Sequence, residues 1–375
     1  MVTWRREQVL AVAVVAALLA PEAADAQRRK KTEEELTQVL EIPPDPPVFV
    51  IADAARLSFL NPPMTARGLL SQQTRDAVKW LLGQSRGRKL IKIRAFVAGT
   101  GDQRRVPAIV SEELSERKLA LPAVTVVQAG GLPMEGAQVV LEAALEEKKP
   151  VNPAGLAFIS GQVGRPAEGE AGLEKAAARS ADSLKLAAEA AGSAALLRVS
   201  CFLTSLEDAD AARAAVSARF PAVPLLLVQT QRLPRERLVE CEGVARLKQP
   251  PASEVEFLNP EGLAASKAYS QIARVNSTRL VITAAQLAFR YSEDDARLAF
   301  SRLEKTLEGA KSSLKRAVIV NSYPLSGQMA EMIRKVRFDW LDPARPPAST
   351  LLPFEGLPSI DSSFAIEAVA IGSAQ

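Results

Sequence analysis

One short pattern recurs three times along the chain and constrains its fold more than any other feature. Each copy has a Leu-Pro step, then a turn and a strand, and then a glutamate followed by small residues. The steps are Leu132-Pro133, Leu233-Pro234 and Leu357-Pro358, and the glutamates are Glu142, Glu242 and Glu367. Because a repeated signature indicates a repeated structural unit, the chain is predicted to contain three copies of one domain.

Each copy also carries a β-rich run between two helices, upstream of its Leu-Pro step. The runs are Lys92–Val97, Arg198–Leu203 and Arg316–Val320. The preceding helices are predicted at Leu69–Leu82, at Leu173–Ala191 and after a capping box at Ser292, and the following helices at Val106–Glu116, Asp208–Arg219 and Ser326–Arg337. The repeated unit is therefore β-β-α-β-α-β-β, an α+β sandwich with both helices on one face of the sheet.

The other face of each sheet must be covered as well. Strands such as Leu225–Val228 carry apolar residues on both sides, which is typical of a sheet buried on both faces. Three sheets packed around a pseudo-threefold axis would cover those faces. We therefore predict an intramolecular pseudo-trimer that is a monomer in solution.

The N-terminus reads as an export signal. Arg5 and Arg6 precede an apolar run at Val9–Ala20, and Ala24-Asp25-Ala26 supplies small residues for cleavage after Ala26. An uncleaved anchor, flanked by the basic residues 28–31, is the alternative. We expect an exported bacterial protein, periplasmic or secreted, with no membrane association beyond this signal.

The rest of the chain divides by composition and repeat. Residues 27–47 are charged and then proline-rich, and are predicted to form an extended spacer. The three units are placed at 48–148, 153–248 and 257–375.

Composition excludes several classes of function. The chain has no histidine, which rules out histidine-based acid–base catalysis and histidine metal ligands. Its two cysteines, Cys201 and Cys241, cannot form a cysteine-rich zinc site; they could pair, but buried free thiols are favoured. The net charge of +4 is spread along the chain, so no nucleic-acid partner is expected. No cofactor fingerprint or metal cluster is present, and none is expected.

Three further motifs point to a known family. Phe158–Val163 contains Ser160-Gly161-Gln162, Tyr269-Ser270-Gln271 lies in the third copy, and Ile282–Gln286 follows it. With these motifs the chain resembles the reactive-intermediate deaminase family (Rid or YjgF-type, also described as endoribonuclease L-PSP) from about Val48 to Ile371. The resemblance implies chorismate-mutase-like domains, which in the family form homotrimers with ligand clefts between subunits.

The resemblance also implies a chemistry and a site. Family deaminases hydrolyse 2-imino acids to 2-oxo acids and ammonia, an arginine binds the substrate carboxylate, and a glutamate in the last strand positions the attacking water. Carried over by position, Glu240 is the candidate catalytic residue. The candidate substrate-binding residues are Ser160, Gly161, Gln162 and Tyr269.

The chain departs from the family where that chemistry is located. The arginine position holds Val124 in the first copy, Leu225 or Val223 in the second, and Ser349 in the third. The glutamate survives only as Glu240, with Val140 and Ala365 at the other two positions. Cations that could replace the arginine are Arg232, which we include among the binding residues, and Arg198, Arg316 and Arg345.

Three functions follow as hypotheses. The first is a catalytically degenerate exported protein that binds small metabolites in inter-domain clefts. The second is an imine or enamine deaminase rebuilt around Glu240, and the third is a non-enzymatic envelope scaffold. Two residue-level alternatives stay open: Glu240 paired with a nearby cation as a structural group, and Ser160-Gly161-Gln162 as a bulged strand end.

Overall fold

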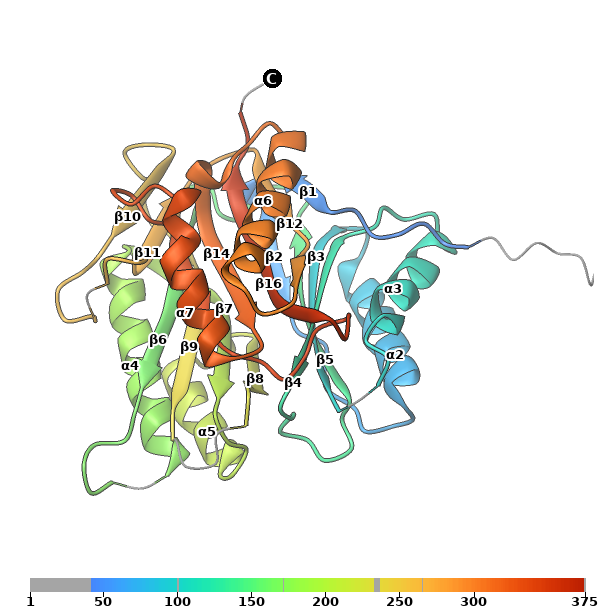
Figure 1. The fold of residues 1–375 in the computed structure, drawn as a ribbon, viewed down its shortest axis with the longest axis horizontal. Coiled ribbons are helices and arrows are strands. Elements are labelled where there is room, and N and C mark those ends of the chain that lie inside the picture. The colour runs from blue at the N-terminus through green and yellow to red at the C-terminus, as the bar shows by residue number, and fades with distance from the viewer. Residues whose placement is uncertain (1–41, 100, 171, 233–236, 265, 374–375) are drawn as a thin grey trace, which may run out of the picture. The chain divides into compact units, whose positions relative to one another are not determined.

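The computed structural model describes residues 42–99, 101–170, 172–232, 237–264 and 266–373, which form three mixed sheets with helices (Figure 1). The export signal, its cleavage site and the Leu233-Pro234 step lie outside the described residues. Residues 42–47 of the expected spacer form neither helix nor strand. No helix in the described chain combines the length and the apolar character needed to cross a membrane.

The first sheet has four strands in the order β2-β5-β3-β4. Its elements are β2 (Leu57–Leu60), α2 (Leu70–Ser85), β3 (Lys89–Ala98), α3 (Arg105–Ser115), β4 (Ala123–Ala129) and β5 (Val139–Glu146). Strands β3 and β4 are parallel and joined through α3, while β5 runs antiparallel to both of its neighbours.

The second sheet repeats this order as β6-β9-β7-β8 and continues through β11 to β10. Its elements are β6 (Leu156–Gly164), α4 (Leu173–Ala190), β7 (Ser193–Leu203), α5 (Ala209–Arg219), β8 (Leu225–Gln229), β9 (Val239–Leu247), β10 (Val255–Leu258) and β11 (Ile272–Val275).

The third sheet has the order β1-β12-β16-β14-β15, and β13 also pairs with β16. Its elements are β1 (Phe49–Ala52), β12 (Leu280–Thr283), β13 (Gln286–Phe289), α6 (Glu293–Gly309), β14 (Ala317–Pro324), α7 (Gly327–Val336), β15 (Ala348–Leu351) and β16 (Ser362–Ile371). Short 3₁₀ helices occupy Ala54–Arg56, Leu314–Arg316 and Arg337–Asp339.

The predicted fold class is confirmed: an α+β protein in which one unit occurs three times, each unit with a mixed sheet and two helices (Figure 1). Each sheet packs against its own helices through a separate apolar core. The capping box is also present, because Ser292 accepts from the backbone of Asp295 and the Asp295 side chain accepts from the backbone of Ser292. It fixes the start of α6.

The opposite faces of the three sheets meet in a shared core with three layers. An apolar layer combines β2, β6, β12 and their neighbours, with Phe59, Phe158 and Ile282 among its members. A charged layer follows one step along the strands, because successive inward residues alternate with outward ones. An aromatic layer closes the far side, where Phe354 packs against Phe96, Phe202 and Tyr323 with ring centroids 5.6–6.0 Å apart.

The units exchange edge strands. Strand β1, at the start of the first repeat, pairs with β12 of the third sheet. The β10–β11 hairpin begins the third repeat but pairs with β6 of the second sheet. The boundaries placed at 48–148, 153–248 and 257–375 follow the repeat along the sequence, whereas the hydrogen-bonded sheets cross those boundaries.

The first sheet receives no such strand. The connection between β5 and β6 is only residues 147–155, whereas residues 248–279 connect β9 to β12 and contain the hairpin. A short connection leaves no chain to form a hairpin, so β2 pairs only with β5. The three units are therefore equivalent in order but not in their edges.

The two cysteines form a disulfide, which corrects the expectation of free thiols. Cys201 on β7 and Cys241 on β9 lie directly opposite each other in register, with their Cα atoms 4.1 Å apart. Sequence separation concealed this contact, because the intervening α5 and β8 return the chain to the same sheet. One of the two bonded residues, Cys241, directly follows Glu240 in the sequence.

Candidate functional site

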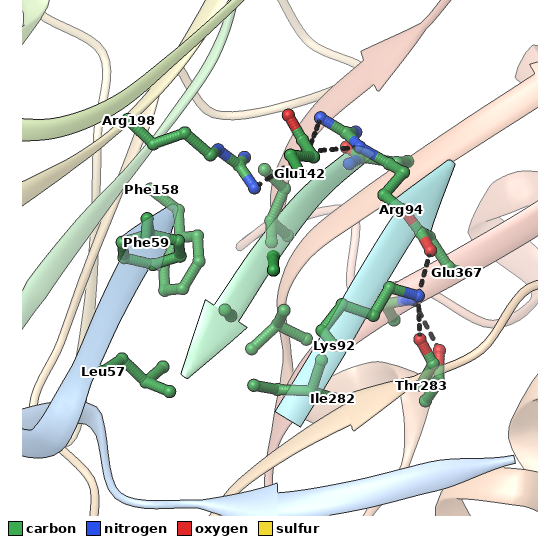
Figure 2. A pocket seen from close by; sticks show the side chains of 16 residues that line it. Leu57, Phe59, Lys92, Arg94, Glu142, Phe158, Arg198, Ile282, Thr283 and Glu367 are labelled. Atoms are coloured by element: carbon green, nitrogen blue, oxygen red, sulfur yellow. Dashed lines mark hydrogen bonds and ion pairs between the residues drawn. The ribbon is translucent and has the colours of Figure 1, made fainter. Parts of the chain in front are cut away.

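The recurring glutamates form the centre of the molecule. Glu142, Glu242 and Glu367 occupy equivalent positions on β5, β9 and β16, opposite Arg94, Ser200 and Asn321. All three glutamates are buried. With Lys92, Arg94 and Arg198 they make up what we call the axial charged layer. Figure 2 shows the layer without Glu242.

Two of these carboxylates share two arginines. Arg94 donates to Glu142 at 2.5 Å and to Glu242 at 2.6 Å, and Arg198 contacts the same two groups at 3.2 Å. Burial would lower the pKa of Arg94, but the two carboxylates raise it well above its usual value. These four groups come from the first and second units and join them across the axis.

The third carboxylate joins the third unit to the first. Glu367 accepts from Lys92 and from Thr125, both at 2.6 Å, and from Tyr323 at 2.5 Å. Burial would raise the pKa of Glu367, yet Lys92 and Arg94 hold it at about 2. Glu367 is therefore ionised at neutral pH.

A cavity of about 70 Å³ lies beside this layer, with an apolar wall that includes Leu57, Phe59 and Phe158 (Figure 2). The space suits a few water molecules. The three anions are already matched by three cations, so a charged ligand would leave a buried charge without a partner. We interpret the layer as the structural junction of the units.

A second polar cluster lies where the second sheet meets the third. Ser349 of β15 donates its backbone N–H to Ser160 Oγ at 2.8 Å, and Ser160 Oγ donates to the carbonyl of Ser270 at 2.6 Å. Ser270 also bridges to Ala348 at the start of β15. These bonds bring the predicted residue Ser160 to the edge of the third unit, close to the position of the missing arginine.

Gly161 and Glu240 lie together at this place, which we call the Glu240 interface. A side chain on Gly161 would collide with the Glu240 carboxyl group, so only glycine lets Glu240 lie across the strand. The register of β6 against β9 also shifts between Ile159 and Gln162, so the motif forms a bulge as well. The bulge and the close approach of Glu240 therefore coincide.

Glu240 is 9% exposed, and no residue in the described chain donates a hydrogen bond to its carboxyl group. Burial raises the pKa of Glu240 to about 8, and the nearby Glu242 adds to the effect, while Arg334 opposes it. No described cation forms an ion pair with it. The alternative of a paired structural glutamate therefore finds no partner in the described residues.

Tyr269 and Gln162 complete the predicted set. Burial raises the pKa of Tyr269, and the negative charge of Glu240 raises it further, which places the phenol within the field of that carboxylate. Gln162 donates to the Ser160 carbonyl at 2.9 Å and to Gln271 Oε1 at 2.7 Å. Gln162 thus holds the bulge in place through its own hydrogen bonds.

Two arginines at this interface were not predicted from the sequence. Arg337 is 3% exposed, its Nε has no hydrogen-bond partner, and no described carboxylate pairs with it. Burial lowers its pKa to about 10, with a contribution from Arg334 on α7. Both arginines influence the pKa of Tyr269. An arginine at the end of a helix looks the same in the sequence whether it is buried or solvated, so the sequence could not indicate that Arg337 is buried.

The predicted replacement cations lie elsewhere. Arg232 donates to the Gly130 carbonyl at 2.8 Å. It forms no ion pair with Glu240 in the described chain. Arg198 belongs to the axial charged layer. Arg316 pairs with Glu254 at 3.0 Å, and Arg345 stacks on Phe257.

The other two interfaces carry different residues at the position of Glu240. Val140 lines a cavity with Leu225, Leu226 and Leu227 of the second unit, and Ala365 lies in the same apolar cluster as Val140. Near Ala365, Thr125 Oγ1 accepts from the backbone of Ala285 at 2.9 Å. Among the described residues, no His/Cys/Asp/Glu group has the arrangement of a metal site.

Comparison with solved structures finds matches among Rid-family and YjgF-family proteins. A Rid-family protein of unknown function from Yersinia pestis matches with 18% identity and a TM-score of 0.29, covering 32% of this chain and 99% of its own. A YjgF-family protein from Neisseria meningitidis matches with 12% identity and a TM-score of 0.24, covering 32% and 97%. A member of the same family from Mycobacterium tuberculosis matches with 20% identity and a TM-score of 0.23, covering 31% and 98%.

No family model and no curated protein matches the sequence. Each structural match covers about a third of the chain, which is the size of one unit. The chain is thus an α+β protein with three mixed sheets, and Rid-family and YjgF-family structures match it over about a third of its length.

Proposed function

We propose that this protein binds a small carbonyl- or carboxylate-bearing metabolite at the Glu240 interface, the one interface of the three that keeps an acidic side chain. The observation that carries the proposal is the Glu240 carboxyl group, which is buried between two units with no donor in the described chain. The carboxyl oxygens are not among the fully enclosed unpaired atoms, so a ligand that pairs with them can reach them.

The neighbouring groups support a ligand of this class. A protonated Glu240 can donate to a carbonyl oxygen, because its pKa of about 8 keeps it largely neutral at pH 7. Arg337 provides a buried positive charge, and Arg334 a second one at the surface of α7. A guanidinium without a carboxylate partner favours an anionic ligand.

The pKa of Glu240 favours turnover as a second candidate function. A group that titrates near neutral pH is suited to proton transfer. In imine hydrolysis, ionised Glu240 would take a proton from water as the oxygen bonds to the imine carbon. It would pass that proton to the imine nitrogen, which gives a carbinolamine. Glu240 would then take the hydroxyl proton of the carbinolamine and give it to the amine as the C–N bond breaks, so that imine and water give a carbonyl compound and ammonia.

The first test is ligand-dependent thermal stability. We expect a 2-oxo acid or a related small carboxylate to raise the melting temperature by a few degrees, because ligand binding stabilises only the folded state. Glu240→Gln should lose most of this shift, whereas Glu174→Gln, at an exposed position on α4, should retain it. An equal shift in all three proteins would contradict the assigned site.

Turnover is tested separately by ammonia release from freshly generated 2-imino acids. Release above the buffer rate that disappears in Glu240→Gln supports the deaminase. Binding without release supports a metabolite-binding protein whose chemistry has been lost. Folded protein that shows neither would favour the scaffold hypothesis instead.

The proposal keeps two expectations from the sequence. We propose that the protein acts after export, with the signal removed after Ala26, and that one chain supplies all three units and remains monomeric. Mass spectrometry of the protein purified from its producing cell would identify the N-terminus. Analytical ultracentrifugation would measure the mass, and a trimer of chains would overturn the monomer.

A further inference from the structure

A cavity of about 220 Å³ lies between the first and second units, at the position that corresponds to the Glu240 interface. Val140 occupies the position in this interface that Glu240 occupies in the interface between the second and third units. The two residues are equivalent because Val140 pairs with Phe96 and Glu240 pairs with Phe202, at matching places in the two sheets. Leu225, one of the two residues expected at the position of the family's arginine in this unit, lines the cavity. We call this region the Val140 interface.

The walls of this cavity are largely apolar. They are formed by Pro62, Pro63, Met64, Val140, Pro224, Leu225, Leu226 and Leu227. A somewhat smaller engineered apolar cavity, of about 150 Å³, is large enough to bind benzene. The cavity therefore has room for a branched aliphatic side chain or a single ring, and its walls favour such a group over a charged one.

Two polar side chains also line the cavity. Both side-chain amide atoms of Asn61 are buried and have no hydrogen-bond partner in the described chain. Arg213 on α5 is half-buried and forms no ion pair or hydrogen bond with a described residue. The Asn61 amide thus needs both a donor and an acceptor, and the Arg213 guanidinium needs an anion.

We propose that the Val140 interface binds an N-acylated amino acid, or the acylated C-terminal residue of a peptide, with an aliphatic or aromatic side chain. The ligand's amide would accept from Asn61 Nδ2 and donate to Asn61 Oδ1. Its carboxylate would pair with Arg213, and its side chain would fill the space beside Val140 and Leu225. Apart from Arg213, no titratable side chain is among the described residues that line the cavity, so binding and not turnover is expected.

The affinity of such a ligand is limited by its size. N-acetyl-leucine has about twelve non-hydrogen atoms, and small ligands gain a few tenths of a kcal/mol per atom, so a Kd on the order of 1 mM is expected. This range suits detection by NMR titration of the isotopically labelled protein.

The test compares three ligands that differ by one group each. N-acetyl-leucine carries all three features, N-acetyl-leucinamide lacks the carboxylate, and 4-methylpentanoate lacks the amide. We expect N-acetyl-leucine to bind at least about fivefold more tightly than either of the others, because each partly buried polar contact contributes about a factor of five to the affinity.

Variants assign the binding to this cavity. Arg213→Gln and Asn61→Leu should each weaken N-acetyl-leucine about fivefold, while Arg165→Gln, at an exposed position, should not. The Arg213-dependent part of this binding should persist in Glu240→Gln, which separates the site from the Glu240 interface. Equal affinity in Arg213→Gln and the native protein, or no saturable binding by the folded protein at 50-fold the expected Kd (about 50 mM), would overturn the proposal.

Discussion

The Glu240 interface and the Val140 interface occupy equivalent places in the fold but differ in chemistry. At the first, Gly161 leaves room for a buried carboxyl group beside Tyr269. At the second, Val140, Leu225 and neighbouring prolines form apolar walls. The backbone of the unit is conserved between them, so the difference lies in a few inward side chains. Repetition within one chain lets each interface change alone, which identical subunits of a homotrimer cannot do.

The axial charged layer explains why such divergence leaves the fold intact. Its glutamates occur in all three units, but its cations come only from the first two, as Lys92, Arg94 and Arg198. The units are thus joined by unlike partners. Each unit therefore contacts its neighbours through different side chains.

The largest expected effect tests whether Glu240 is a buried neutral acid. Its pKa is about 8 in the folded protein against 4.5 when unfolded, so its contribution to stability is present below pH 4.5 and is lost as the pH rises through 8. Glu240→Gln should therefore have the same free energy of unfolding as the native protein at pH 4. At pH 9 it should be more stable by about 5 kcal/mol.

Urea denaturation at a series of pH values measures this difference. A gap that widens between about pH 5 and pH 8 supports the buried acid. A constant gap across that range would mean that Glu240 is ionised in the folded protein and has a partner.

A smaller effect tests the apolar character of the other interface. Val140→Glu places a carboxyl group in the Val140 interface, where Asn61 and Arg213 are the polar residues of the lining. We expect a loss of about 3 kcal/mol of stability at pH 9, and less at pH 5, where the new group is protonated. If the loss of stability is equal at the two pH values, the pocket is more polar than its lining residues indicate.

The smallest effect concerns Arg334, whose positive charge opposes the rise of the Glu240 pKa. Arg334 is half-exposed and also pairs with Glu331, so its influence is screened by water. Arg334→Gln should raise the Glu240 pKa by less than about one pH unit. NMR titration of the Glu240 carboxyl carbon would measure this shift, and a downward shift would contradict the arrangement.

Much of the fold was predictable from local patterns. The helices α4 and α7 begin and end within one residue of their predicted bounds, because apolar spacing and capping residues are local signals. The recurring Leu-Pro and glutamate signature identified the threefold repeat. It also marked Glu142, Glu242 and Glu367, although their role as a charged junction could not be inferred without their partners.

The candidate site was only partly predictable. Ser160, Gly161 and Glu240 do meet at one interface, as the resemblance implied. Arg232 does not join them, whereas Arg334 acts on Glu240 and Arg337 acts on Tyr269. Which cation reaches an interface depends on how a helix of the next unit packs. The exchange of β1 and of the β10–β11 hairpin between units was likewise not predictable, since strand pairing joins residues far apart in the chain.

The sequence by itself determined the repeated α+β unit, its helices, the absence of histidine chemistry and the positions where the family's arginine is missing. These follow from local periodicity and composition, which need no knowledge of distant contacts. The tertiary structure decided the cysteine pairing, the junction of the three glutamates and the contrast between the Glu240 and Val140 interfaces. Each of these depends on side chains from distant parts of the chain that meet in a buried space. There, an unmatched charge or polar atom is destabilising because water cannot solvate it.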